Sequence, residues 1–276
     1  MTKTYTNIDR FQIHSDKTLL SSDKVVIEEP LQIRLRHDNN SEIFSITMRT
    51  PGADRELATG LLFCEGIINT ATDILSYHQE TVDQLTSENQ LTIRLNETLD
   101  FDLSRSKRRH PSYSGCGICG KTSISSIELK PSRAMRPSNT QFSNQMIRDL
   151  KALLAQQPLF SSTGGSHVAG LVYETNGQLT SPIFFEDVGR HNALDKLIGY
   201  ELINNDLNQA GILLLSGRIG FELVQKSVIA GFSTIIALGA PSSLAVNAAK
   251  QFGITLVGFA KDDRFNLYTA DSHRLL

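Results

Sequence analysis

Two of the three cysteines of the chain lie in the stretch Gly115-Cys116-Gly117-Ile118-Cys119-Gly120. Glycine adopts left-handed backbone angles without steric cost, so three glycines in six residues disfavour a helix and predict a loop that brings two thiols close together. Basic residues flank this loop, at Arg105, Lys107, Arg108, Arg109, His110 and Lys121. Because positive charge stabilises a thiolate, these neighbours are expected to lower the cysteine pKa and to favour nucleophilic sulfur chemistry.

A second set of chemically useful residues follows the predicted strands of the C-terminal half. In open parallel sheets, ligands bind beyond the carboxyl ends of the strands, and helix N-termini there favour anions. Arg190, Arg218, Lys261 and Arg264 would give this edge positive charge, which predicts a phosphate-bearing ligand. Each arginine taken alone also fits a solvated surface charge or an ion pair. His191 fits either a ligand contact or a hydrogen bond at a helix N-terminus.

The composition places the chain among ordinary globular proteins. Its 276 residues suffice for one large or two ordinary domains, and 40% of them are hydrophobic. The net charge of -2 gives no basic surplus for non-specific nucleic-acid binding. No apolar run approaches the roughly 20 residues that span a bilayer, and residues 1–20 lack the apolar core of a signal peptide. An odd number of cysteines argues against a disulfide framework, so a cytoplasmic location is expected.

The elements that must position these residues change in character along the chain. Residues 1–135 predict a β-rich α+β domain ending in the C-x-x-C loop, and prolines and serines near 130–144 mark a boundary. In the first domain a helix is expected over 55–65, with Asp54 as N-cap and Cys64 packed as a small hydrophobe. In residues 136–276, strands alternate with helices, which predicts an α/β unit with a largely parallel sheet. Asn176-Gly177 predicts a hairpin turn.

Eight short motifs follow one another in order along nearly the whole chain. They are RTPGADRELA at 49–58 with EGI at 65–67, GCGICG at 115–120, TGGSH at 163–167, EDVGRHNALDK at 186–196, SGR at 216–218, PSSLA at 241–245 and GFAKDDR at 258–264. With these motifs the sequence resembles the formate dehydrogenase accessory sulfurtransferase family, the FdhD/NarQ family. The family often has arginine where Lys261 stands, and lysine keeps the charge but not the bidentate fork.

The resemblance implies a function, a fold and partners. It implies a sulfur carrier that accepts sulfur from a cysteine desulfurase and passes it to the molybdenum bis-molybdopterin guanine dinucleotide cofactor, the bound substrate, for formate dehydrogenase. It implies a three-layer αβα, cytidine-deaminase-like fold for 136–276, and a homodimer. Cys116 would carry the persulfide, and Cys119 would be a second carrier or a resolving thiol. The residues expected to bind the cofactor are Phe259, Ala260, Lys261, Asp262, Asp263, Arg264, Arg218, Arg190 and His191, and no metal bound directly by protein ligands is expected.

Other functions also fit parts of this pattern. A thioredoxin-like site usually opens a helix with its C-x-x-C, which the glycines here disfavour. A structural zinc site needs four ligands, so it would require His110, His167 or a second subunit. A non-catalytic chaperone that only binds the guanine dinucleotide cofactor is the main alternative. Deaminase activity is excluded, because His191-Asn-Ala lacks the catalytic glutamate and Ser216-Gly-Arg-Ile lacks a cysteine pair.

Overall fold

The computed structural model describes residues 3–38, 40–79, 89–99, 134–135, 141–175, 178–205, 207, 211–261 and 264–270. The C-x-x-C loop with Cys116 and Cys119, as well as Asp262 and Asp263, lies outside the described residues. Within the described ranges the strands form three sheets, of two, four and six strands. No helix in these ranges is long and apolar enough to cross a membrane.

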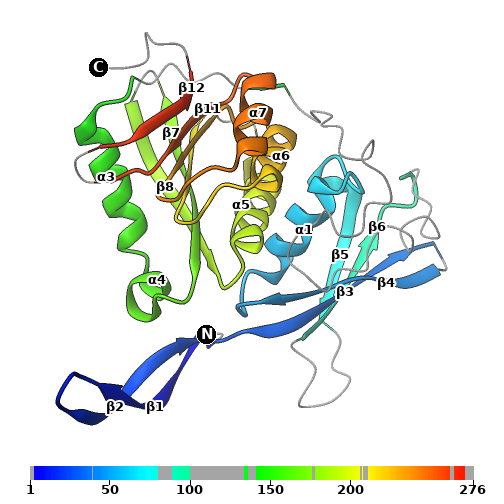
Figure 1. The fold of residues 1–276 in the computed structure, drawn as a ribbon. Coiled ribbons are helices and arrows are strands. Elements are labelled where there is room, and N and C mark those ends of the chain that lie inside the picture. Colours follow the sequence, from blue (N-terminus) through cyan, green and yellow to red (C-terminus); the bar gives the residue numbers. More distant parts are fainter. Residues whose placement is uncertain are drawn as a thin grey trace.

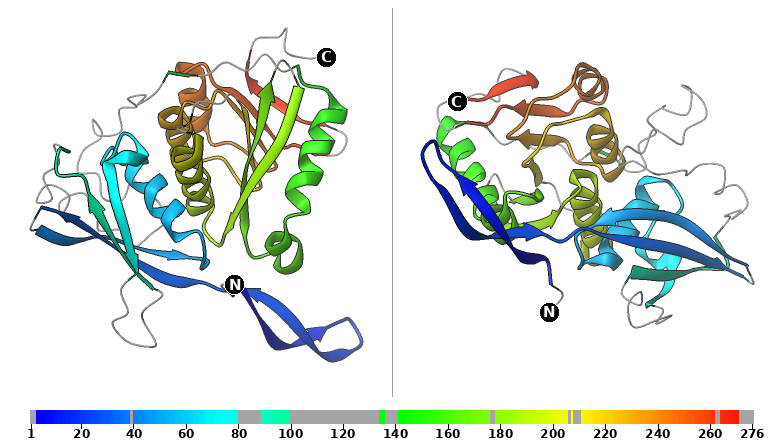
Figure 2. Two further views of the ribbon diagram at one scale, coloured as in Figure 1. Left: turned by 180° about the vertical axis from the view of Figure 1, so that it is seen from behind. Right: turned by 60° about the horizontal axis from the view of Figure 1, so that its bottom comes forward.

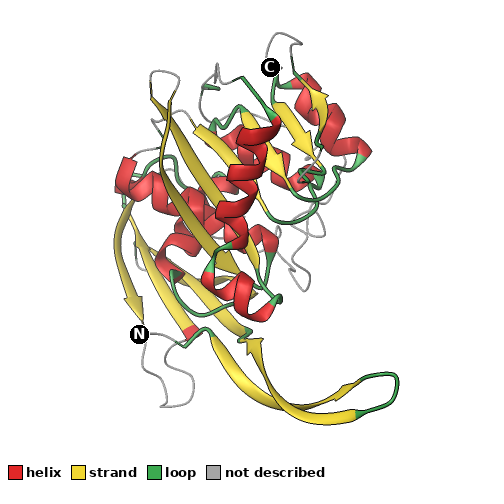
Figure 3. Cartoon of the chain, turned by 90° about the vertical axis from the view of Figure 1, so that its left-hand side faces the viewer, coloured by secondary structure: helices red, strands yellow, loops and turns green. Residues whose placement is uncertain are grey.

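The chain begins with a long two-stranded hairpin that projects from the rest of the molecule (Figures 1 and 3). Its strands pair antiparallel along their whole length, β1 (Tyr5–Ile13) with β2 (Thr18–Val26). The sequence predicts only short strands, at 11–13 and 25–27. Most side chains of the hairpin face solvent, so its strands lack the apolar alternation that marks a half-buried strand. The sequence pattern therefore reveals only part of the hairpin.

The four-stranded sheet has one face covered by a helix. Its strands, in the order β4-β3-β6-β5, are β3 (Glu29–His37), β4 (Asn40–Arg49), β5 (Ile74–Gln79) and β6 (Gln90–Leu95). In β3 the alternate residues Leu31, Ile33 and Leu35 are fully buried, as expected for a strand with one face in the core. Helix α1 (Asp54–Cys64) packs on this buried side, and a single 3₁₀ turn, η1 (Ala71–Asp73), precedes β5.

The first residues of α1 differ from the prediction. The N-cap is Ala53, in a left-handed conformation with φ of 53°, and it makes no side-chain cap. Asp54 is instead the first helical residue. Its carboxylate accepts two hydrogen bonds from Arg49, from Nε to Oδ1 and from Nη2 to Oδ2, each 2.9 Å long. The Asp54 carboxylate therefore neutralises the fully buried guanidinium of Arg49. Leaving that buried charge unpaired would cost more free energy than losing a helix cap.

The six-stranded sheet is mixed rather than largely parallel. Its order is β12-β11-β10-β9-β7-β8; the parallel pairs β9–β10 and β10–β11 form the centre, β7 runs antiparallel to β8 and β9, and β12 runs antiparallel to β11. The predicted hairpin joins β7 and β8, because Thr175 pairs with Gln178. The strands are β7 (His167–Thr175), β8 (Gln178–Asp187), β9 (Gly211–Leu215), β10 (Thr234–Ala237), β11 (Thr255–Gly258) and β12 (Asn266–Thr269).

Helices cover both faces of this sheet (Figures 1 and 2). The strands are buried on both sides: Ala169, Leu171 and Leu213 belong to one apolar cluster, with α5, α6 and α7, while Ile212 and Leu214 belong to a second, with α3. The helices are α3 (Asn144–Ala155), the short α4 (Pro158–Thr163), α5 (Arg190–Asn205), α6 (Phe221–Ala230) and α7 (Ser243–Gln251).

The four-stranded sheet joins the six-stranded sheet through a tight crossing of α1 and α5. One apolar cluster runs from β3 through α1 and α5 to β9 and β10. At the crossing two glycines face each other. A Cβ on Gly60 would lie 1.9 Å from the Asp195 carbonyl oxygen, and one on Gly199 would lie 1.9 Å from that of Glu56. Only glycine allows the two backbones to come this close.

Candidate functional site

The topology of the six-stranded sheet gathers loops from five strands at one edge. Strands β8, β9, β10 and β11 end at this edge, and β7 begins there. The residues at this edge, here called the strand-end rim, are 166–167, 187–191, 216–218, 239–241, 259–261 and 264. All predicted cofactor-binding residues that the structure describes fall in this rim, although the sequence separates them by up to 74 positions (264 − 190).

Backbone hydrogen bonds connect the loops of the rim to one another. The Gly239 N–H donates to the Gly217 carbonyl at 3.2 Å, and the Phe259 N–H donates to the Gly239 carbonyl at 3.1 Å. Glycine is required at this contact, because a Cβ on Gly239 would lie 2.5 Å from the Gly217 oxygen. The loops after β9, β10 and β11 therefore form one continuous backbone surface.

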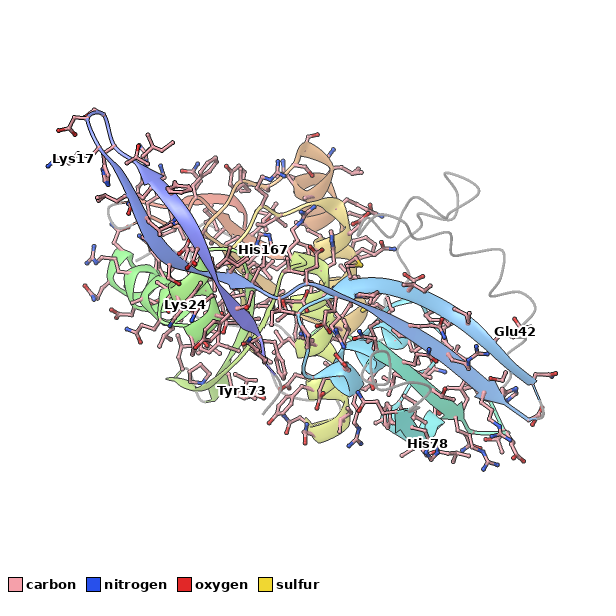
Figure 4. The ribbon with its side chains drawn as sticks, turned by 90° about the horizontal axis from the view of Figure 1, so that it is seen from below. Lys17, Lys24, Glu42, His78, His167 and Tyr173 are labelled. Atoms are coloured by element: carbon pink, nitrogen blue, oxygen red, sulfur yellow. The ribbon has the colours of Figure 1, made fainter. Side chains whose placement is uncertain are left out.

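Positive charge gathers at the β7–β9 side of the rim. The site of a Cβ on Gly217 lies 3.2 Å from His167 Nδ1 and 3.9 Å from Arg190 Cδ, so these side chains meet over this glycine. Burial lowers the pKa of His167, and the charges of Arg190, His191 and Arg218 lower it further, against the opposing effect of Asp187. In Figure 4 His167 is labelled near the centre of the molecule, between the hairpin and the β3–β4 strands.

Arg190 and His191, two neighbours in this cationic group, differ in their contacts. Arg190 Nε is buried and has no hydrogen-bond partner among the described residues, which is unusual for a buried donor. His191 Nε2 lies 2.8 Å from Glu222 Oε2 at the start of α6. The structure thus places a carboxylate within hydrogen-bonding distance of His191 inside the protein.

The loop after β11 exposes an aromatic ring on a strained backbone. Phe259 has a φ of 51°, a left-handed conformation that is rare for a bulky residue, and it is 37% exposed. Such strain is often found at functional sites. Ala260 is buried in the core and its N–H donates to the Ala237 carbonyl, whereas Lys261 and Arg264 are exposed and close a turn through a 2.9 Å backbone bond.

Part of the EDVGRHNALDK motif has a structural role. The buried Asp187 carboxylate accepts from the Thr50 N–H at 3.1 Å and lies 2.7 Å from Lys196 Nζ. Lys196 Nζ also donates to the Thr50 carbonyl, at 2.9 Å, and Asn192 Nδ2 donates to the Met48 carbonyl, at 2.7 Å. These residues connect the segment after β4 to the start of α5, where Arg190 is the first helical residue.

Cys64 lies apart from the rim, at the end of α1. It is partly buried, packs against the core and sits beside Lys226 and Asp195, which form an ion pair of 2.6 Å. Burial raises the pKa of the Cys64 thiol, against the opposing charge of Lys226. The thiol is therefore protonated at neutral pH and poorly suited to nucleophilic attack, in line with the packing role expected from the sequence.

His167 is not among the residues that the sequence predicts to bind the cofactor, because it precedes a strand rather than following one. From sequence it is named only as one of the further ligands that a zinc site would require. The reversed direction of β7 brings it to the rim. The signal that could have found it is the TGGSH stretch, whose histidine follows two glycines directly before a predicted strand.

Comparison with known proteins gives the relationships of the chain. A family model described as the FdhD/NarQ family matches residues 26–276. The chain is 37% identical to the sulfur carrier protein FdhD of Sulfurisphaera tokodaii, over 94% of each chain, and 40% identical to that of Sulfolobus acidocaldarius, over 90% of each. A crystal structure from Desulfotalea psychrophila, described as a formate dehydrogenase accessory protein, shares the fold with a TM-score of 0.72 and 24% identity, covering 99% of this chain and 100% of the other. The chain therefore belongs to the FdhD/NarQ family.

Proposed function

We propose that the protein is a sulfur carrier that serves a formate dehydrogenase. The observation that carries the proposal is the C-x-x-C loop in a chain that belongs to the FdhD/NarQ family and aligns along 94% of its length with a relative named as a sulfur carrier. The donor is a cysteine desulfurase, and the transfer takes place in the cytoplasm, where thiols stay reduced. The working form is a homodimer.

The proposed first step is a thiol exchange. The Cys116 thiolate attacks the outer sulfur of the persulfide on the desulfurase; a new S–S bond forms on Cys116, and the donor cysteine leaves as a thiolate. Delivery of the outer sulfur, as sulfide, to the molybdenum bis-molybdopterin guanine dinucleotide cofactor, the substrate, takes two electrons; a thiol supplies them when its thiolate attacks the inner sulfur of the persulfide and a disulfide forms. Cys119 either carries sulfur in the same way or attacks the inner sulfur of Cys116, which forms a disulfide and releases hydrosulfide.

The strand-end rim binds the guanine dinucleotide end of the cofactor in this proposal. The support is its concentration of cations around glycine backbone, the buried Arg190 Nε without a described partner, and the exposed ring of Phe259. Phe259 stacks on a base or on the pterin, and Asp262 or Asp263 accepts hydrogen bonds from guanine. Arg190, Arg218, Lys261 and Arg264 meet phosphates, each charge-assisted bond contributing roughly 1.5–3 kcal/mol.

Nucleotide binding is expected to discriminate the base and to depend on Arg264. By calorimetry, guanosine diphosphate should bind more tightly than adenosine diphosphate, because adenine lacks the amino and ring N–H groups that an aspartate would accept from. Arg264→Ala should weaken guanosine diphosphate binding roughly tenfold or more through a lost phosphate contact. Arg148→Ala, on the exposed face of α3, serves as the matched control. Equal affinity for both nucleotides, or undiminished binding by a folded Arg264→Ala protein, would refute the assignment.

Binding of a nucleoside diphosphate is also expected to strengthen as the pH falls. Burial and neighbouring cations keep the pKa of His167 below its usual range in the free protein. A bound anion stabilises the imidazolium and raises that pKa, so binding takes up a proton, and affinity falls with rising pH by up to about tenfold per pH unit. Calorimetry from pH 5.5 to 8 on wild type and His167→Gln separates this effect from titration of the nucleotide, which both proteins share. Identical pH profiles would remove His167 from the site.

The alternative function is a chaperone that binds the same cofactor without carrying sulfur. The cationic rim alone fits this function equally well. Incubation with a cysteine desulfurase and cysteine, followed by intact mass spectrometry, separates the two. A carrier gains the mass of one sulfur atom, which reductant removes, whereas a chaperone binds the nucleotide and gains none.

A further inference from the structure

The projecting hairpin carries an apolar patch at its outer end. The register pairs Phe11 with Leu20 and Ile13 with Thr18, so these side chains share one face of the ribbon. Phe11, Ile13 and Leu20 are 69%, 78% and 69% exposed. The same face carries Asp9 next to them, and Asp9 forms no ion pair with any described residue. We call Phe11, Ile13 and Leu20 the hairpin patch.

The inner end of that same face does rest on the protein. Tyr5 and Val26 pair with each other and lie in register with the hairpin patch. Val26 Cγ1 lies 3.0 Å from where a Cβ on Gly165 would be, and Tyr5 lines a pocket of about 280 Å³ with Leu159. The inner end of this face therefore contacts the rest of the protein, and the hairpin extends the same face outward beyond that contact. Figure 3 shows the outer part of the hairpin projecting from the molecule.

A two-stranded hairpin is marginally stable on its own and needs a further layer to cover its apolar face. Whatever covers the hairpin patch must be present whenever the chain folds. A second copy of the same chain meets this condition, whereas a partner met only during catalysis would leave the patch exposed for long periods, with a risk of aggregation.

The chain also presents a surface that matches this patch. The outer face of the four-stranded sheet, opposite α1, carries Ile43, Ile46 and Met48 on the edge strand β4, and they are 47%, 50% and 48% exposed. Their register partners on β3 include Arg34, and Arg36 lies two residues further along the same face. Neither arginine forms an ion pair with a described residue. We call Ile43, Ile46 and Met48 the β4 patch.

We propose that the hairpin patch of each subunit packs on the β4 patch of a second copy, in a reciprocal two-fold interface. Both patches are apolar, and the unpaired Asp9 beside one complements Arg34 and Arg36 beside the other. In Figure 4 the hairpin and the β3–β4 ribbon extend in opposite directions across the same side of the molecule. A two-fold axis through this side brings each hairpin over the other subunit's ribbon, so both contacts form at once. This inference rests on the proposed homodimer and locates its interface.

Sedimentation and light scattering over a concentration series test the assembly. Wild type is expected to be a dimer, and Phe11→Ser with Leu20→Ser should raise the dimer dissociation constant at least about 100-fold, because two apolar anchors are lost. Ile46→Ser on the β4 patch should act in the same direction. Leu244→Ser, an equally exposed apolar residue on α7 at 51%, should leave the constant unchanged. A monomeric wild type, or a dimer indifferent to the hairpin and β4 variants, overturns the proposal.

A photo-crosslinker placed at Phe11 identifies the contact itself. In a dimer mixed from ¹⁴N- and ¹⁵N-labelled chains, mass spectrometry should find position 11 joined to the peptide containing residues 40–49 of the other chain. Crosslinks within one chain, or to another segment, overturn the proposed interface even if a dimer exists. Sulfur loading of wild type is measured separately, so failure of the interface and failure of the carrier function are distinguished.

Discussion

A Cys116→Ala protein is expected to gain no sulfur from a cysteine desulfurase, whereas wild type gains the mass of one sulfur atom that reductant removes. The loss is complete where Cys119 is only a resolving thiol, because the S–S bond to the carrier cannot form without the attacking thiolate. A second carrier at Cys119 would leave a reduced gain of sulfur. Nucleotide binding at the strand-end rim should persist in the variant, since the rim is built from other segments of the chain. Intact mass spectrometry and calorimetry on the same preparation measure both properties. Sulfur gain by Cys116→Ala equal to that of wild type would show the assignment to be wrong.

Cys64→Ala is the matched control for this experiment. Its thiol packs beside Lys226 and Asp195 and has a raised pKa, so its removal should leave sulfur loading intact. The expected cost is about 1 kcal/mol of unfolding free energy, from a small cavity. Cys119→Ala then distinguishes the two roles of the second loop thiol: retained loading with blocked release points to a resolving thiol. A folded Cys64→Ala protein that no longer loads sulfur would contradict the role given to each cysteine.

The largest effect on stability is expected at the crossing of α1 and α5. Gly199→Ala would place a methyl group 1.9 Å from the Glu56 carbonyl oxygen, and a backbone atom cannot move aside as a flexible side chain can. We expect a loss of about 3 kcal/mol of unfolding free energy, at the upper end for overpacked cores. This loss would outweigh the ~1 kcal/mol that alanine gains over glycine inside a helix. Gly60→Ala should behave alike.

Urea denaturation followed by circular dichroism measures this loss as a shift in midpoint. Gly220→Ala is the control, because Gly220 has a φ of -88° and its added Cβ would meet no atom within 4 Å. Its cost should stay below about 1 kcal/mol. Because α5 begins with Arg190, separation of the helices should also weaken nucleotide binding. An unchanged midpoint for Gly199→Ala would mean that the two helices do not pack this closely.

Helix spacing and strand–helix alternation carried most of the fold information in the sequence. The apolar spacing of Met146, Ile147, Leu150, Leu153 and Leu154 predicts a helix, and α3 confirms it. The alternation after 190 correctly indicates α5 to β11. The direction of β7 and the addition of β12 were not predictable in this way. Strand direction depends on connections and on sheet order, which periodicity does not report. The short helix α4 was not predicted either, because six residues are too few to show a helical period.

The candidate site divides in the same way. Arg190, Arg218 and Phe259 could be placed at one edge from sequence, because each follows a strand that ends there. The roles of Asp187 and Lys196 could not, since a buried charge and a ligand-binding charge look alike in a sequence and differ only in their partners. The role of Gly60 and Gly199 in helix packing was not predicted either. Glycine is a weak helix former, and its value at a close helix contact is visible only when the facing helix is known.

The amine of Lys196 is enclosed between the segment after β4 and α5, so its chemical reactivity can report when these two segments separate. The amine is held between the Thr50 carbonyl, the Glu186 carbonyl and the Asp187 carboxylate, and the residue is 2% exposed. An amine-reactive reagent can reach it only when the segment after β4 separates from α5, so its labelling rate measures how often that separation occurs. Comparison with an exposed amine such as Lys250 gives the protection factor directly. Followed with and without a bound nucleotide, that rate shows whether occupation of the rim closes the junction between the two sheets.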